Sequence, residues 1–232
     1  MHIRREWRHR RADGGATAAS DAISTVHAGA RVAPPGGGKI APFAFDLTDE
    51  ASIAAAVRGM ADAPPRLIIV ATGLLHGADL RPEKSLRDQS ADAYARLFAV
   101  NAIGPALIAK HMLARPPRQG RLVFAALSAR VGSIGDNRLG GWHAYRASKA
   151  ALNMIMRNVA IELGRNNPDA VAVTLHPGTV DTGLSAPFQR NVAPDSLFPP
   201  DLAARQLLDV IAGLGPAQSG GCYDWAGRSI AF

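Results

Sequence analysis

Apolar residues recur along this chain in short continuous runs, separated by longer segments in which they follow helical spacing. Runs of this length and composition are typical of strands in a buried parallel sheet. Three strong runs, which are almost entirely apolar, lie at residues 67–71, 121–126 and 170–175, and three weaker ones lie at 23–27, 42–45 and 221–225. We therefore predict six strands.

Four of the segments between these runs predict helices, at about residues 51–60, 91–113, 145–163 and 200–214. Thr48 is the expected N-cap of the first helix. Gly104 and Pro105 interrupt the second, and Gly164 is expected to end the third.

Strands that alternate with helices at this spacing pair in parallel through right-handed crossovers. The pattern therefore predicts an α/β fold: a doubly wound, Rossmann-like, mostly parallel sheet with helices on both faces. We expect a single domain over residues 1–232. Such sheets bind ligands at the carboxyl ends of their strands.

Composition supports a folded domain and narrows the range of partners. The 232 residues are 47% hydrophobic and 19% charged, which suits one domain with a sizeable core. The net charge of +7 is concentrated at residues 1–11, where five arginines face one glutamate. Because no basic patch interleaved with aromatic residues follows, we expect no nucleic-acid partner. No apolar run is long enough to suggest a membrane partner.

Cysteine and histidine usage adds two expectations. Cys222 is the single cysteine, so the chain can form no internal disulfide. No Cys/His cluster has the spacing of metal ligands, so we expect no metal. A cytoplasmic location fits both points, and residues 1–11 lack the apolar stretch of a secretory signal.

Tyr145 and Lys149 carry the clearest chemical signal. They are four residues apart and therefore lie one turn apart on one helix face. An ammonium near a phenol favours the phenolate, which suits proton transfer near neutral pH. An isolated pair at this spacing would more often be two unrelated surface residues, so its surroundings decide. Ser128 and the loop 176–182, which follow predicted strands, place a hydroxyl and flexible backbone at the same sheet edge.

Four motifs together resemble the short-chain dehydrogenase/reductase family. They are N-A-I-G at 101–104, S-A-R-V-G-S-I at 128–134, Y-R-A-S-K at 145–149 and H-P-G-T-V-D-T at 176–182. Their order is similar to that of the C-factor-like and sniffer-like carbonyl reductase branch, over about residues 21–232. The resemblance implies transfer of hydride between a nicotinamide cofactor and a carbonyl or alcohol.

The resemblance also implies the catalytic roles. Tyr145 would be the general acid in reduction and the base in oxidation. Lys149 would lower the pKa of Tyr145 and hold the nicotinamide ribose, and Asn101 would bind a water that links Lys149 to solvent.

Ser128 would hold the substrate carbonyl. Many relatives have two adjacent serines here, of which the second acts, and the second position in this chain is Ala129. Ser133 is the alternative donor. We favour Ser128 because it directly follows the strand.

Cofactor contacts implied by the resemblance follow several strands. Besides Tyr145 and Lys149, they are Asp46 and Leu47 at the adenine, Ala71, Thr72 and Gly73 in a tight turn, Pro177 and Gly178 near the ring, and Val180 and Thr182 at the carboxamide. Relatives have Asn-Ala-Gly at 71–73, and the usual Asn is missing here. Arg31, at the end of the second strand, suits a 2′-phosphate, and no acid at that strand end competes for a ribose hydroxyl. NADP(H) is therefore favoured over NAD(H).

The family's glycine-rich, pyrophosphate-binding loop is absent from residues 1–20, so the first strand and this loop are atypical or missing. One hypothesis is a frameshift. If the arginines of 4–11 are encoded as CGG, a one-base shift reads Gly-Gly-Ser-Gly-Gly-Ile-Gly. The gene sequence, or N-terminal peptides of the purified protein, would decide this.

The sequence therefore predicts an NADP(H)-dependent oxidoreductase for a small to medium carbonyl or alcohol, under an apolar cover formed by Leu184, Phe188, Leu197 and Phe198. The alternative is a catalytically impaired or non-enzymatic signalling protein on the same fold. Relatives are often oligomers through their long helices, so a homodimer or homotetramer is expected.

Overall fold

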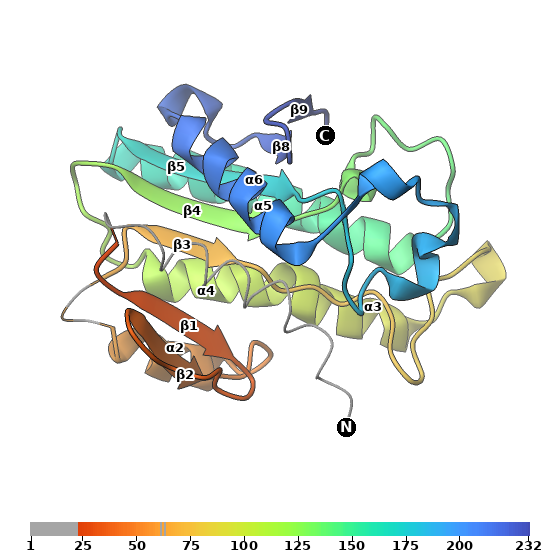
Figure 1. The fold of residues 1–232 in the computed structure, drawn as a ribbon, viewed down its shortest axis with the longest axis horizontal. Coiled ribbons are helices and arrows are strands. Elements are labelled where there is room, and N and C mark those ends of the chain that lie inside the picture. The colour runs from red at the N-terminus through yellow and green to blue at the C-terminus, as the bar shows by residue number, and fades with distance from the viewer. Residues whose placement is uncertain (1–22, 61, 63) are drawn as a thin grey trace.

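The computed structural model describes residues 23–60, 62 and 64–232, and its central element is a five-stranded sheet (Figure 1). The strands follow the order β3 (Leu67–Val70), β4 (Leu122–Leu127), β5 (Ala170–His176), β8 (Cys222–Asp224) and β9 (Ser229–Ile230). The first four are parallel, and β9 is antiparallel to β8. The predicted α/β fold with a mostly parallel sheet is confirmed.

Two further pairs of strands lie outside this sheet. β1 (Val26–Ala30) and β2 (Ile40–Ala44) pair in parallel with each other, and β6 (Thr179–Val180) pairs with β7 (Leu197–Phe198). Within the described part of the chain, neither β1 nor β2 pairs with β3. The predicted atypical first strand and the frameshift hypothesis concern residues 1–20, which lie outside the described residues.

The helices occupy the predicted segments. They are α2 (Glu50–Arg58), α3 (Ala91–Phe98), a π-helical turn (Ala99–Ile103), α4 (Gly104–Met112), α5 (His143–Asn166) and α6 (Pro200–Gly213). Short 3-10 turns lie at Leu86–Asp88, Arg130–Gly132, Ala186–Asn191, Pro194–Ser196 and Pro216–Gln218.

Two predicted helix ends were wrong. Asp49, not Thr48, caps α2: its carboxylate accepts the Ala51 N–H at 2.9 Å, while Thr48 bonds to Asp46. The helix α5 continues past Gly164 because the backbone there stays right-handed, and it ends at Asn166. A glycine ends a helix only where the chain turns left-handed.

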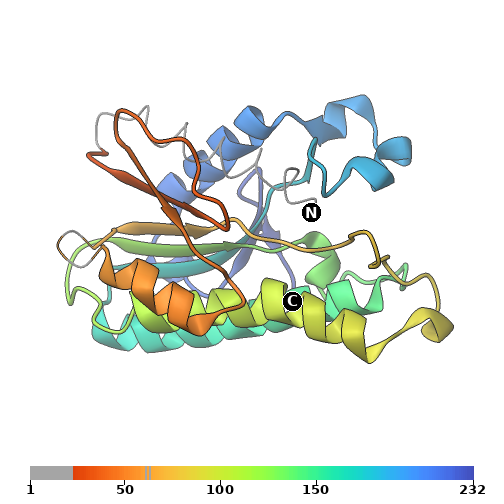
Figure 2. The same cartoon turned by 90° about the horizontal axis from the view of Figure 1, so that it is seen from below.

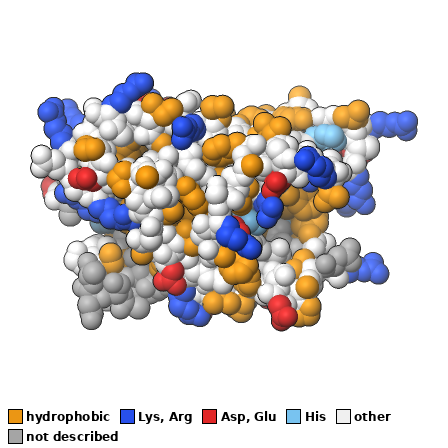
Figure 3. Space-filling view, turned by 90° about the horizontal axis from the view of Figure 1, so that it is seen from above, with side chains coloured by type: hydrophobic (Ala, Val, Ile, Leu, Met, Phe, Trp, Pro, Cys, Tyr) orange, Lys and Arg blue, Asp and Glu red, His pale blue; other side chains and the backbone are white. Residues whose placement is uncertain are grey.

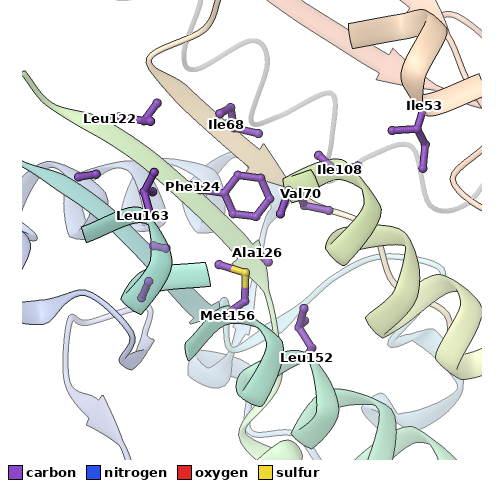
Figure 4. Packing of buried hydrophobic residues seen from close by; sticks show 14 of the residues in the cluster. Ile53, Ile68, Val70, Ile108, Leu122, Phe124, Ala126, Leu152, Met156 and Leu163 are labelled. Carbon is purple, nitrogen blue, oxygen red and sulfur yellow. The ribbon is translucent and has the colours of Figure 1, made fainter. Parts of the chain in front are cut away.

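Alternating side chains of β4 face two helical layers, which confirms helices on both sides of the sheet (Figure 2). Phe124 and Ala126 belong to the cluster that includes α4 and α5, whereas Val123 and Ala125 belong to the cluster that includes α6. In Figure 4, Phe124 lies among residues of β3, α4 and α5. The strand β4 is therefore the buried centre of the domain. The residues that follow it, from Ser128 on, lie at the carboxyl end of the sheet.

Polar and apolar side chains mix on the surface shown in Figure 3, where basic residues are spread among uncharged and hydrophobic ones. Of the helices described, none is both long and apolar enough to cross a membrane.

Candidate active site

Helix α5 places Tyr145 and Lys149 at the carboxyl end of β4. Both side chains are buried, with 6% and 2% of their surface exposed. The Lys149 Nζ donates to the carbonyl oxygen of Leu127 at 2.8 Å and lies 5.9 Å from the centre of the Tyr145 ring. A Cβ on Gly132 would lie 2.7 Å from the Lys149 Cβ, so a glycine is required there. No local pattern in the sequence indicates this requirement.

Burial sets the protonation of the pair. It raises the pKa of Tyr145 above its ordinary value and lowers the pKa of Lys149 to about 7. Lys149 was predicted to lower the pKa of Tyr145, whereas in this structure the pKa of Tyr145 is raised. Desolvation dominates, and the Lys149 ammonium bonds to a backbone carbonyl. Tyr145 stays protonated at neutral pH, which is the form that can donate a proton.

Asn101 ties the loop after β3 to α5. It is fully buried in the π-helical turn, and its amide both accepts the Leu74 N–H and donates to the Leu74 carbonyl oxygen, each at 2.8 Å. Its Nδ2 also donates to Ser148 Oγ, which in turn donates to the Tyr145 carbonyl oxygen. Asn101 thus fixes the helical turn that carries Tyr145. The water that Asn101 is predicted to bind, between Lys149 and solvent, stays a prediction.

Ser128 lies beside α5, as expected, but its hydroxyl donates to the Asn153 Oδ1 at 2.8 Å. Both residues are buried. Ala129, on the opposite side of the extended backbone, packs in the cluster that contains Tyr145. Ser133 Oγ accepts the Asp136 N–H. The signal for Asn153 was its position four residues after Lys149, on the same helix face.

The turn after β3 fits a polar ligand. Thr72 is 8% exposed, and its Oγ1 has no hydrogen-bond partner among the described residues. A Cβ on Gly73 would lie 3.9 Å from the Lys149 Nζ. A buried hydroxyl without a partner, in a turn that approaches a lysine, is what a bound ribose or phosphate would satisfy, so these residues fit a nicotinamide nucleotide. Ala71 packs against the α6 layer.

The loop after β5 contains a position that requires glycine. Gly178 has φ +74°, and a Cβ there would lie 2.6 Å from the Phe198 ring. Next to Pro177 and Gly178, Val180 is buried in β6, and the Thr182 hydroxyl donates to the Val180 carbonyl oxygen at 3.4 Å. The loop therefore continues from the carboxyl end of β5, close to Phe198.

Arg31 has a carboxylate partner that the sequence analysis missed. Its Nε lies 3.7 Å from the Asp46 Oδ2, and both side chains are about half exposed. The parallel register pairs Ala30 with Ala44, so the residues that follow the two strands meet. Hydrogen bonds from Thr48 lower the pKa of Asp46, which keeps it charged. The acid near Arg31 thus comes from the neighbouring strand, while Leu47 packs into the core.

The predicted apolar cover divides into two groups. Leu184 and Phe188 pack in the Tyr145 cluster, whereas Phe198 packs with Val180 and Trp225. Trp142 also packs in the Tyr145 cluster, and the sequence analysis did not single it out.

Comparison with known proteins agrees with this arrangement. A family model described as Enoyl-(Acyl carrier protein) reductase matches residues 9–196. The C-signal of Myxococcus xanthus is 41% identical over 140 residues, which are 60% of this chain and 78% of that protein. The 1-hydroxy-2-glutathionyl-2-methyl-3-butene dehydrogenase of Rhodococcus sp. (strain AD45) is 36% identical over 56% of this chain and 54% of that protein.

Among solved structures, an NADPH-bound carbonyl reductase from chicken fatty liver has a TM-score of 0.76 and 23% identity, covering 90% of this chain and 88% of that one. At this identity the likeness supports the fold alone. The family match and the C-signal relative go further: the chain belongs to the short-chain dehydrogenase/reductase family. It therefore stands among the dehydrogenases and reductases.

Proposed function

We propose that this protein is an NADP(H)-dependent oxidoreductase that reduces a small to medium carbonyl compound and oxidises the corresponding alcohol. The observation that carries the proposal is the buried Tyr145–Lys149 pair, fixed to the end of β4 through the Leu127 carbonyl. Burial keeps Tyr145 protonated, so its hydroxyl can donate to a carbonyl oxygen as negative charge develops there. Lys149 holds the ribose and supplies positive charge when protonated.

Cofactor preference rests on Arg31 and on relatives. When bound, the nicotinamide supplies the hydride. The residues that would hold the cofactor are Arg31, Asp46 and Leu47 at the adenosine end, Ala71, Thr72, Gly73, Tyr145 and Lys149 near the ribose, and Pro177, Gly178, Val180 and Thr182 near the nicotinamide. The Arg31 guanidinium is half exposed and faces Asp46 through its Nε, and its remaining N–H groups suit a 2′-phosphate. The structurally similar carbonyl reductase binds NADPH.

Ser128 is the proposed donor to the substrate carbonyl, with Asn101 in support of the Tyr145 turn. A hydroxyl has a single proton, so Ser128 must turn that proton away from the Asn153 Oδ1 before it can serve a carbonyl.

We also propose assembly as a homodimer or homotetramer through α5. Met154 and Ile161 on this helix are 63% and 45% exposed, and their spacing of seven residues places them on one helix face, as expected of a helix that packs against a second subunit. Light scattering coupled to size-exclusion chromatography measures the mass directly, and a monomer at micromolar concentration contradicts assembly.

The competing proposal is a non-enzymatic signalling protein, which the 41% identity to the C-signal favours. Two measurements on the purified protein separate the proposals. A ligand that binds only the folded state raises the melting temperature, so about 1 mM NADPH should stabilise an enzyme. NADPH oxidation over a panel of aldehydes and ketones then tests turnover. Stabilisation by NADPH without turnover favours the signalling proposal. If NADPH neither stabilises the protein nor is oxidised, the enzyme proposal is rejected.

A further inference from the structure

Trp142 occupies a strained backbone conformation directly before the catalytic helix. Its φ of +50° is the one positive value at a non-glycine residue in the described part of the chain. Gly140 and Gly141 precede it with φ of +62° and +64°. A bulky side chain in the left-handed region costs free energy, which a third glycine would avoid. Strain that persists next to an active site points to a role for the side chain itself.

Glu83 and Arg146 hold this turn in place. The Trp142 N–H donates to the Glu83 carbonyl oxygen at 2.6 Å, and the Ala144 N–H donates to the Glu83 carboxylate at 3.3 Å. Glu83 is only 3% exposed. The Arg146 Nε donates to the Gly141 carbonyl oxygen at 3.0 Å. Hydrogen bonds to Glu83, in the loop after β3, and from Arg146, in the first turn of α5, therefore hold the backbone around Trp142 in place.

This turn places the Trp142 indole beside the ring of Tyr145. The Trp142 and Tyr145 ring centres are 6.2 Å apart and nearly edge to face, and Phe188 lies 4.8 Å from Trp142. His76 stacks edge-on against Phe188 at 5.6 Å, and its Nε2 lies 3.1 Å from the Gly183 carbonyl oxygen. Three aromatic side chains from three separate segments thus form a wall beside the Tyr145 ring.

This wall limits what can approach Tyr145. Because the Trp142 ring centre lies 6.2 Å from that of Tyr145, a carbonyl bound at the Tyr145 hydroxyl would have one substituent of its carbon near Trp142. Flat rings meet aromatic edges and faces at 4.5–7 Å with extra stabilisation, which a puckered saturated ring lacks. Trp142 also lines a cavity of about 400 Å³ together with Leu139, which is 91% exposed.

We infer that Trp142 is a specificity-determining residue that contacts the substrate and selects a flat, unsaturated substituent on the carbonyl carbon. The inference rests on the proposed function and adds the substrate class to it.

The test compares two ketones that differ only in ring flatness, acetophenone and cyclohexyl methyl ketone, in NADPH-dependent reduction. Wild type should prefer acetophenone in kcat/KM. Trp142→Leu should lower that preference about tenfold, mostly through acetophenone, since an aromatic contact contributes on this scale. Trp142→Phe should keep the preference within about threefold. Leu139→Ala is the matched control, because Leu139 is 91% exposed and lies outside the cluster that contains Tyr145, and it should leave the preference unchanged.

A second variant guards against misfolding. Trp142→Gly removes the ring and relieves the strained backbone, so it should melt no lower than Trp142→Leu and show the same loss of preference. Equal kcat/KM for both ketones in wild type, or an unchanged preference in Trp142→Leu, overturns the inference while the proposed function stands. No turnover of any carbonyl by wild type overturns the proposed function and this inference with it.

Discussion

Replacing Lys149 by methionine should change how stability depends on pH. Lys149 is 2% exposed, and burial lowers its pKa from 10.5 to about 7. Between these two pH values the unfolded chain binds a proton at this site that the folded protein does not. The free energy of unfolding therefore rises with pH across this window, by about 1.4 kcal/mol per pH unit. Methionine has a similar length and no charge, so this contribution disappears in Lys149→Met.

Urea unfolding followed by circular dichroism measures the effect. Between about pH 7.5 and pH 9.5, the free energy of unfolding of wild type should rise by about 2.5 kcal/mol relative to that of Lys149→Met, because this interval covers two pH units of the window. Lys149→Met should be the more stable protein at neutral pH, where wild type is burying part of a charge. Parallel pH profiles for the two proteins would mean that Lys149 remains fully charged in the folded state, which is the opposite of this prediction.

Three further predictions test other parts of the site. Asn101→Ala should lower the free energy of unfolding by about 3 kcal/mol, because both backbone groups of Leu74 lose a buried partner; a change under about 1 kcal/mol in urea would contradict this. Arg31→Ala should raise the KM for NADPH about tenfold and leave that for NADH unchanged, whereas equal changes would remove the 2′-phosphate role. Ser128→Ala should lower kcat about tenfold and stability by about 1 kcal/mol, while Asn153→Ala should lower stability alone; identical kinetics for these two variants would exclude Ser128 as the carbonyl donor.

The pattern of apolar residues was enough to predict the parallel core of the sheet. The runs at 67–71, 121–126 and 170–175 correspond to β3, β4 and β5, because strands buried on both faces must be apolar throughout. The two-residue strands β6 and β7 could not be predicted, since such short segments carry no period. The end of α5 was missed because a glycine stops a helix only when tertiary structure turns the chain left-handed there.

The candidate site, like the fold, could be predicted from the sequence only in part. Local spacing placed Tyr145 and Lys149 on one face of a helix, and the structure brings them to the predicted sheet edge. The pKa direction of Tyr145 was wrong because burial depends on residues far away in the chain. The bonds from Glu83 to the Trp142 turn and from Ser128 to Asn153 likewise join segments separated by tens of residues, and no local pattern reports them.

The most direct test of the central claim compares wild type with Tyr145→Phe in NADPH oxidation with a carbonyl substrate. The substitution removes one hydroxyl from a buried ring and leaves the packing around it intact. A positioned general acid contributes about 10²- to 10⁴-fold. We predict a loss of kcat on that scale in Tyr145→Phe, with NADPH still raising the melting temperature of both proteins. Equal kcat for the two proteins would contradict the account.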